Sequence, residues 1–208
     1  QKIINIICDT YNRGYFSEII DRSIEKYLSE INLSLNSDLT INKNWSFESE
    51  SSFTEKNKED NKIKKNIYDR FFYLIERSSP EKSFVDKLEK SSKVIWWHKN
   101  GDRGQNNFAI PYDVKKNMKP FYIDFIVKFK DGKLGFFDTK SGNTLDHPDT
   151  PFKNDGLLKF INTKKNYTGG IITNRSKNAT NDHDWRIFNG EGINISNSNH
   201  KSWKSLDF

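Results

Sequence analysis

The sequence is poor in cysteine and in long apolar runs. Its 208 residues include one cysteine, Cys8, which excludes an internal disulfide and a zinc site built from cysteines, so a reducing compartment is expected. No apolar run approaches the roughly 20 residues that cross a bilayer, and the opening stretch does not match a signal peptide, so no membrane partner is expected. The first residue is not methionine, and we expect the chain to be a piece of a larger protein.

Two further absences concern function. The chain has no GxxxxGK[ST] sequence, so it carries no phosphate-binding loop of its own. Its four histidines show no metal-ligand spacing. What it does have is charge, with 34 Lys and Arg against 28 Asp and Glu and a net charge of +6. This balance is compatible with a polyanionic partner, and it is equally expected of a basic surface kept for solubility.

The apolar pattern predicts an N-terminal helical extension or linker over 1–78 and an α/β domain over 79–208. In the extension we expect helices over 15–31 and 63–77, a strand within 39–48 and a mobile link over 49–66. Ser79-Pro80-Glu81 is typical of a helix start, and this helix should end near Lys90. The remaining predicted elements are strands at 93–97 and 107–112, a hairpin at 121–140, a helix at 152–163, and strands at 168–173 and near 192–195. Together they predict a central mixed β-sheet flanked by helices.

The hairpin carries charges where buried strands are expected. Asp124 lies inside the apolar run FYIDFIV, while Asp138 and Lys140 follow LGFF, and such charges cost free energy unless they are paired or bind something. A two-residue Asp-Gly turn would leave Asp138 on the face opposite Asp124. A three-residue loop with Gly132 in the left-handed conformation would set Asp124 directly opposite Asp138. Gly132 suits both turns, but only the second makes sense of the charges.

Opposed carboxylates repel across a ladder, and a divalent cation reverses the sign of that interaction. Hard oxygen ligands favour Mg²⁺ or Mn²⁺. Lys140 would orient a water or stabilise phosphate charge beside such a site; the plainer alternative is a simple ion pair with Asp138. Glu81 falls on the apolar stripe of its helix, at the end nearest the strands, where its ordinary role would be to stabilise the helix dipole.

Residues 79–174 resemble the PD-(D/E)xK nucleases, and within them the endonuclease domain of type III restriction enzymes and related helicase-linked nucleases. The segments that carry the resemblance are SPEKSFVDKLE, VIWWHKN, FAIPY, FYIDFIVKFKDGKLGFFDTKSG, FKNDGLLKFI and GGIIT. The resemblance implies a restriction-endonuclease-like αβββαβ core and metal-dependent hydrolysis of double-stranded DNA. Ile123 stands where the family name has Pro, and Asp138 is one methylene shorter than the alternative Glu.

By that resemblance Asp124, Asp138, Lys140 and Glu81 are the catalytic residues. Asp124 and Asp138 would ligate Mg²⁺, for which Mn²⁺ can substitute, with the Thr139 carbonyl and Glu81 as further ligands. Lys140 would position the attacking water, and the Thr139 side chain should point into the core. The resemblance also implies a bacterial, cytoplasmic restriction system used in phage defence. Its other parts would be an ATP-driven helicase region in the parent protein, a methyltransferase subunit and a second nuclease copy.

Several smaller candidates remain. Lys99, Arg103 and Gln105 follow the first strand of the domain and would either approach a DNA backbone or lie in a solvated turn. Lys153, at the start of the next helix, is a candidate phosphate contact. His98 is expected to be exposed in a turn, one of Trp96 and Trp97 to lie in the core, and Trp185 to be buried.

The functional alternatives also stay open. A junction resolvase or another helicase-linked nuclease would share this fold and this chemistry. A non-catalytic DNA-binding or docking module would keep the fold without using the site.

Overall fold

The structure of the chain is a computed structural model that describes residues 20, 22–24, 45–49, 57–74, 79–104, 106–115, 117–141, 144–174, 184–188, 190, 195 and 202–208. By its contacts the chain divides into two units, Gln1–Asn42 with Lys115–Asn117 and Lys43–Val114 with Met118–Phe208. In the first unit residues 20 and 22–24 are helical, in agreement with the helix predicted over 15–31, most of which lies outside the described residues.

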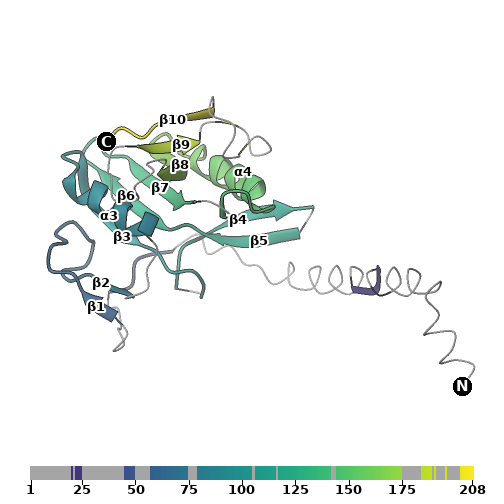
Figure 1. Cartoon of the computed structure of the whole chain (residues 1–208), viewed down its shortest axis with the longest axis horizontal. Coiled ribbons are helices and arrows are strands. Elements are labelled where there is room, and N and C mark those ends of the chain that lie inside the picture. Colours follow the sequence, from purple (N-terminus) through teal and green to yellow (C-terminus); the bar gives the residue numbers. More distant parts are fainter. Residues whose placement is uncertain are drawn as a thin grey trace, which may run out of the picture. The chain divides into compact units, whose positions relative to one another are not determined.

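The described part of the second unit is built on a six-stranded sheet with the order β10-β9-β8-β7-β6-β3 (Figure 1). Its strands, in chain order, are β3 (Val94–Lys99), β6 (Phe125–Phe129), β7 (Leu134–Thr139), β8 (Tyr167–Asn174), β9 (Trp185–Phe188) and β10 (Trp203–Ser205). β7 and β8 run parallel, whereas the other neighbouring pairs are antiparallel. The predicted α/β class with a mixed sheet is confirmed.

Helices α3 and α4 flank this sheet. α3 (Ser79–Lys90) has the predicted bounds and leads into β3. α4 (Thr150–Ile161) begins two residues before the predicted start at 152. The reason is Pro151, whose fixed φ suits the first turn of a helix although the apolar pattern does not register it. α4 carries the chain from β7 to its parallel neighbour β8, as a crossover must.

Side chains alternate along the central strands, so each face of the sheet buries its own set. The core around α3 includes Phe84, Leu88, Phe125, Val127, Phe137 and Ile172. The core around α4 includes Ile126, Phe136, Leu157 and Ile171. Successive residues of a strand thus belong to opposite cores, because the side-chain period of a strand is two. α3 and α4 therefore cover opposite faces of the sheet.

A separate two-stranded ribbon consists of β4 (Ala109–Val114) and β5 (Asn117–Tyr122), and α4 packs against β4 (Figure 1). The strand predicted at 107–112 is confirmed as a strand, but it does not join the main sheet. The run 121–127, predicted as one strand, is divided between β5 and β6. The break falls at Ile123 and Asp124, so Asp124 lies at the point where the chain enters the sheet.

The helix predicted over 63–77 is wrong over 63–74, and the rest of it lies outside the described residues. β1 (Asn57–Glu59) pairs with β2 (Phe72–Leu74), and the segment between them hydrogen-bonds to the edge strand β3. Ile67 N donates to Trp97 O and Trp97 N donates to Lys65 O, both at 2.8 Å. An edge strand needs partners for its backbone groups, and this pairing prevails over the helical spacing of the apolar residues.

The described part of 49–66 is anchored, so the predicted mobile link is also wrong there. Lys65 Nζ donates to the carbonyl oxygens of Leu88, Glu89 and Ser91 at the end of α3. The Glu89 carboxylate in turn accepts hydrogen bonds from the backbone nitrogens of Lys64 and Lys65. The carbonyl groups that every helix leaves open at its C-terminus are satisfied here by a lysine that is distant in sequence.

The remaining predictions concern aromatic residues and the two ends of the unit. Trp97 is fully buried and Trp185 is 2% exposed, so both core predictions are confirmed. A strand was predicted within 39–48; its described residues 45–48 have no regular structure, and the others lie outside the described residues. Most of the strand predicted near 192–195 also lies outside them. No helix among the described residues is long and apolar enough to cross a bilayer.

Candidate functional site

The hairpin of β6 and β7 has the register that brings its charges together. Phe129 N donates to Lys133 O at 3.0 Å, and Gly132 has a φ of 86°. Phe125 lies opposite Phe137, so the next position of the same register sets Asp124 against Asp138. The three-residue loop is thus the correct alternative, because Gly132 adopts the left-handed conformation without strain.

Asp124 is held from two sides just before β6. Its Oδ1 lies 3.1 Å from Lys99 Nζ, and its Oδ2 accepts hydrogen bonds from the N and Oγ1 of Thr139 at 2.7 and 2.6 Å. The prediction that the Thr139 side chain points into the core is wrong, since its hydroxyl binds this carboxylate. Burial alone would raise the pKa of Asp124, but Lys99 and Thr139 lower it below its usual value. Asp124 is therefore ionised at neutral pH.

Lys99, the last residue of β3, connects Asp124 to α3. Its Nζ lies 3.2 Å from Glu81 Oε1 and 3.1 Å from Asp124 Oδ1. Burial alone would lower the pKa of Lys99, but the two carboxylates raise it, so the ammonium group stays charged. Glu81 thus faces the strand ends, as its position on the helix predicted, and Lys99 lies in the strand rather than in the turn after it.

Asp138 is more deeply buried than the charged groups around it, with a side chain 3% exposed. Its Oδ2 lies 2.6 Å from Lys140 Nζ in an ion pair, and no other described group donates to that oxygen. Burial raises the pKa of Asp138 to about 7, with the Lys140 ammonium opposing the rise and the Asp124 carboxylate adding to it. A proton or a further cation would stabilise this group.

The other candidates for DNA contact, Lys153, Arg103 and Gln105, have different surroundings. Lys153 is in the first turn of α4, where burial lowers its pKa, the Lys140 ammonium lowers it further and the Asp138 carboxylate opposes this. Arg103 is exposed in the turn after β3, and Gln105 lies outside the described residues. Lys99 and Lys153 therefore join the carboxylates, whereas Arg103 stays in the turn where the sequence placed it.

We call the charged cluster the set of Glu81, Asp124, Asp138, Lys99, Lys140 and Lys153. It balances three carboxylates with three ammonium groups. No three His, Cys, Asp or Glu side chains within the described ranges are grouped so that they could hold a metal ion. Mg²⁺, however, usually takes only one or two carboxylates together with water and substrate phosphate. The oxygens of Asp124 and Asp138 fit that requirement, because the two carboxylates lie opposite each other in the hairpin and the buried Asp138 Oδ2 has only the Lys140 ammonium as a described partner.

His98 is a functional candidate that the sequence misplaces. It lies within β3 and is partly buried, not exposed in a turn. Its ring centre lies 5.0 Å from that of Phe47 and 5.8 Å from that of Tyr68. Burial, and then the Lys99 ammonium, lowers the pKa of His98 to about 4, so the ring is neutral at pH 7. The alternation in VIWWHK, which sets Trp96 and His98 on one face, is the signal that could have extended the strand.

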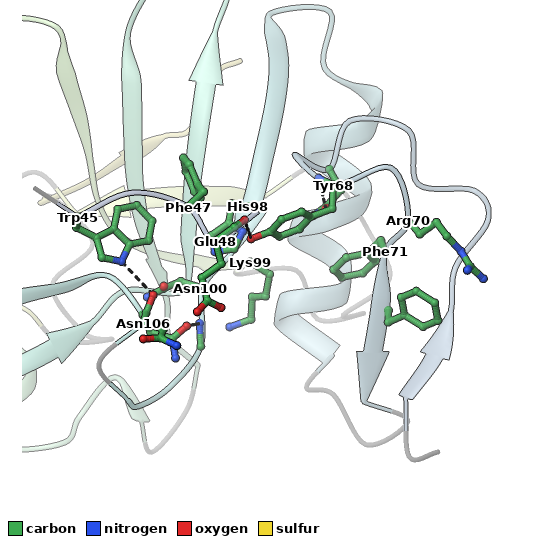
Figure 2. A pocket seen from close by; sticks show the side chains of 14 residues that line it. Trp45, Phe47, Glu48, Tyr68, Arg70, Phe71, His98, Lys99, Asn100 and Asn106 are labelled. Carbon is green, nitrogen blue, oxygen red and sulfur yellow. Dashed lines mark hydrogen bonds between the residues drawn. The ribbon is translucent and has the colours of Figure 1, made fainter. Parts of the chain in front are cut away.

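A pocket of about 240 Å³ lies beside the charged cluster (Figure 2). Its lining comes from residues 45–48, 66–72 and 98–107, and Lys99 belongs to both the pocket and the cluster. The sequence offers no signal for this pocket, because segments far apart in the chain meet only in the fold. Residues 65–67 pair with β3, and Trp45 Nε1 donates to Asn106 O at 3.0 Å.

Comparison with other proteins does not identify a family. Family models, curated proteins and solved structures were each compared with the chain, and none of them matches it. The function is therefore inferred from the chemistry of the site.

Proposed function

We propose that this chain is a metal-dependent nuclease domain that hydrolyses phosphodiester bonds of double-stranded DNA. The observation that carries the proposal is the convergence of Asp124, Asp138 and Lys140 at one end of the sheet, with a buried oxygen of Asp138 whose described partner is the Lys140 ammonium alone. Two opposed, buried carboxylates are expected to bind a cation, because burial makes their negative charge costly.

The order of the elements supports assignment to the PD-(D/E)xK fold. α3, β3, β6, β7, α4 and β8 follow one another as a helix, three antiparallel strands, a helix and a parallel strand, with the β4–β5 ribbon between β3 and β6. We propose that these elements are the restriction-endonuclease-like αβββαβ core. Because one fold can serve many functions, the charged cluster rather than the fold carries the argument.

Asp124 and Asp138 are the side chains that would hold Mg²⁺ or Mn²⁺, with the Thr139 carbonyl and a water-bridged Glu81 as further oxygen donors. A bound ion would supply Lewis-acid stabilisation of the negative charge that develops on the phosphate. The contribution of the chain is to keep both carboxylates in place. Lys99 and Thr139 do this for Asp124, and burial beneath α4 does it for Asp138.

Lys140 supplies a positioned donor beside these acids. Its side chain is 15% exposed and its Nζ lies 2.6 Å from Asp138 Oδ2. An ammonium group has three donors, so Lys140 can bind this carboxylate and still orient a water or a phosphate oxygen on the solvent side. Donors fixed before the reaction need no reorganisation when charge develops, which is the main advantage of such an arrangement.

The proposal extends to the parent protein. An ATP-driven motor region would precede this domain, a methyltransferase subunit would select the target, and a second nuclease copy would cut the second strand, all in a bacterial cytoplasm. A junction resolvase or another helicase-linked nuclease would use the same cluster. The presence or absence of a motor region next to this domain in the parent gene distinguishes these cases.

Calorimetric titration with Mn²⁺ tests the proposal. We expect the 208-residue chain to bind the ion and folded Asp124→Ala and Asp138→Ala variants not to bind it. Asp131→Ala is the matched control, because Asp131 lies in the exposed turn of the same hairpin and pairs only with its neighbour Lys133 among the contacts of the described residues. Binding that survives both cluster substitutions would place the ion elsewhere, and the assignment would fail.

A second candidate is a non-catalytic DNA-binding or docking module. The ion pairs of Lys99 with Glu81 and Asp124, and of Lys140 with Asp138, favour it, because they offset the carboxylate charges without an added ion. In that case Mn²⁺ would produce no binding heat with the parent, and Asp138→Asn would leave duplex binding unchanged. The same titration therefore separates the two candidates.

A further inference from the structure

The pocket beside the charged cluster is walled by a continuous set of aromatic rings. Figure 2 shows Trp45, Phe47 and Tyr68 arranged around it with His98 between them. Neighbouring ring centres lie 4.8 Å apart for Trp45 and Phe47, 5.0 Å for Phe47 and His98, and 5.8 Å for Tyr68 and His98. Such rings offer apolar surface to a planar ligand, and phosphodiester hydrolysis by the cluster does not require them.

The amide groups on one side of the pocket hold the chain rather than a ligand. Asn100 Nδ2 donates to Phe108 O and Ile123 O, and its Oδ1 accepts from Phe108 N, so this side chain has no amide hydrogen left. Asn107 Oδ1 accepts from Gly101 N and fixes the same loop. These hydrogen bonds fix the loop that forms this side of the pocket.

His98 differs from these amides because its Nδ1 is buried and makes no hydrogen bond to any described group. Because Nδ1 is shielded, His98 contributes to the pocket chiefly as an aromatic ring packed between Phe47 and Tyr68.

The size of the pocket and its charged neighbours restrict the class of ligand that it can bind. Its volume of about 240 Å³ is below the roughly 300–1,000 Å³ typical of sites for drug-sized molecules, so it suits a single ring system. Lys99 lines it and also touches Asp124 and Glu81, so a ligand here lies next to the charged cluster. A base inside a duplex has its faces covered by stacking, whereas an unpaired base exposes them.

We propose that this pocket binds a single unpaired nucleobase of a DNA strand whose backbone passes the charged cluster. The inference rests on the proposed nuclease function and adds to it that the duplex is locally opened beside the cleaved bond. Stacking on aromatic rings with few hydrogen bonds tolerates any base, so the pocket recognises the absence of pairing rather than a sequence.

The test measures binding in the absence of metal. A labelled single-stranded oligothymidylate and an abasic oligonucleotide of the same length and charge are titrated with the 208-residue chain in EDTA and followed by fluorescence anisotropy. We expect the abasic strand to bind about tenfold more weakly, since stacking on aromatic side chains contributes a large share of single-strand affinity. Attraction of the backbone alone predicts equal binding.

Substitutions in the pocket locate the effect. Tyr68→Leu should abolish the preference for the strand with bases, and Tyr68→Phe should keep it, because the ring alone is required. Tyr73→Leu is the matched control, being the same change in β2 but outside the pocket lining. Phe47→Leu is a second pocket variant that decides the matter if Tyr68→Leu does not fold.

Equal binding of the oligothymidylate and the abasic oligonucleotide by the parent protein would overturn the inference. Free thymidine competing as well as the unlabelled oligothymidylate would also overturn it. Failure of the nuclease proposal can be distinguished from failure of this inference. Mn²⁺ binding that requires Asp138, combined with equal binding of the two strands, rejects only the nucleobase pocket. A clear preference for bases in a protein that binds no Mn²⁺ rejects only the nuclease.

Discussion

Asp124 and Asp138 are two carboxyl groups of one hairpin that respond oppositely to burial. The pKa of Asp124 is lowered because Lys99 and Thr139 outweigh burial, whereas that of Asp138 is raised to about 7 because burial outweighs the pairing with Lys140. One acid is thus ionised, whereas the other takes up a proton near neutral pH in the absence of a further cation.

The raised pKa of Asp138 has a consequence for stability. The folded protein binds this proton more tightly than the unfolded chain does, so Asp138 reduces the free energy of unfolding progressively as pH rises from about 4 to about 7. In metal-free buffer the stability of Asp138→Asn relative to the parent should therefore increase across this window by about 4 kcal/mol, since each pKa unit corresponds to about 1.4 kcal/mol. Urea titrations at the two ends of the window measure it. A constant difference would mean that Asp138 titrates near its ordinary value.

At the scale of elements, the parallel pair β7 and β8 depends on a close backbone approach. Gly169 of β8 has a φ of 137°, and a Cβ added there would lie in steric conflict with the Phe136 carbonyl. Gly132, in the hairpin turn, also has a positive φ but has open space around it. At Gly132 a side chain is disfavoured only by the backbone conformation, whereas at Gly169 it is disfavoured also by the close backbone of β7.

Alanine at these two positions should have unequal effects. Gly132→Ala should cost about 1–2 kcal/mol, the cost of a left-handed conformation for a residue with a Cβ. Gly169→Ala should cost about 3 kcal/mol or more, because β8 must also move away from β7, and it should weaken Mn²⁺ binding at Asp138. Urea denaturation and calorimetry measure the two effects. Equal costs at the two sites would show that β8 moves freely.

At the scale of the whole second unit, one sheet is shared by two cores. Phe84 under α3 and Leu157 under α4 are both fully buried, on opposite faces. The charged cluster draws Glu81 from α3 and Lys153 from α4, so it is assembled only when both helices are docked.

Core truncation on either face should therefore destabilise the entire unit. Phe84→Ala should cost about 3–5 kcal/mol and Leu157→Ala about 2–5 kcal/mol. In both variants far-UV and near-UV circular dichroism should report one common unfolding transition, because the strands are shared. Two separate transitions in either variant would show that one face folds without the other.

The sequence alone determined the features that have local causes. Pro80 and Glu81 mark the start of α3, and Gly132 marks the hairpin turn. Gly132 suited both loop lengths, so the register that sets Asp124 opposite Asp138 came from the structure. Glu81 was expected near the strand ends and lies there. Each of the features with local causes depends on a backbone preference or a periodicity within a few residues.

The tertiary structure decided what depends on partners distant in the chain. The apolar spacing over 63–77 resembles a helix, but residues 65–67 instead pair with the edge of β3, and the pocket forms between them. Lys99 was assigned to a solvated turn, yet it lies between Glu81 and Asp124. Edge pairing, burial and ion pairing depend on which surfaces meet, and local sequence carries no record of that.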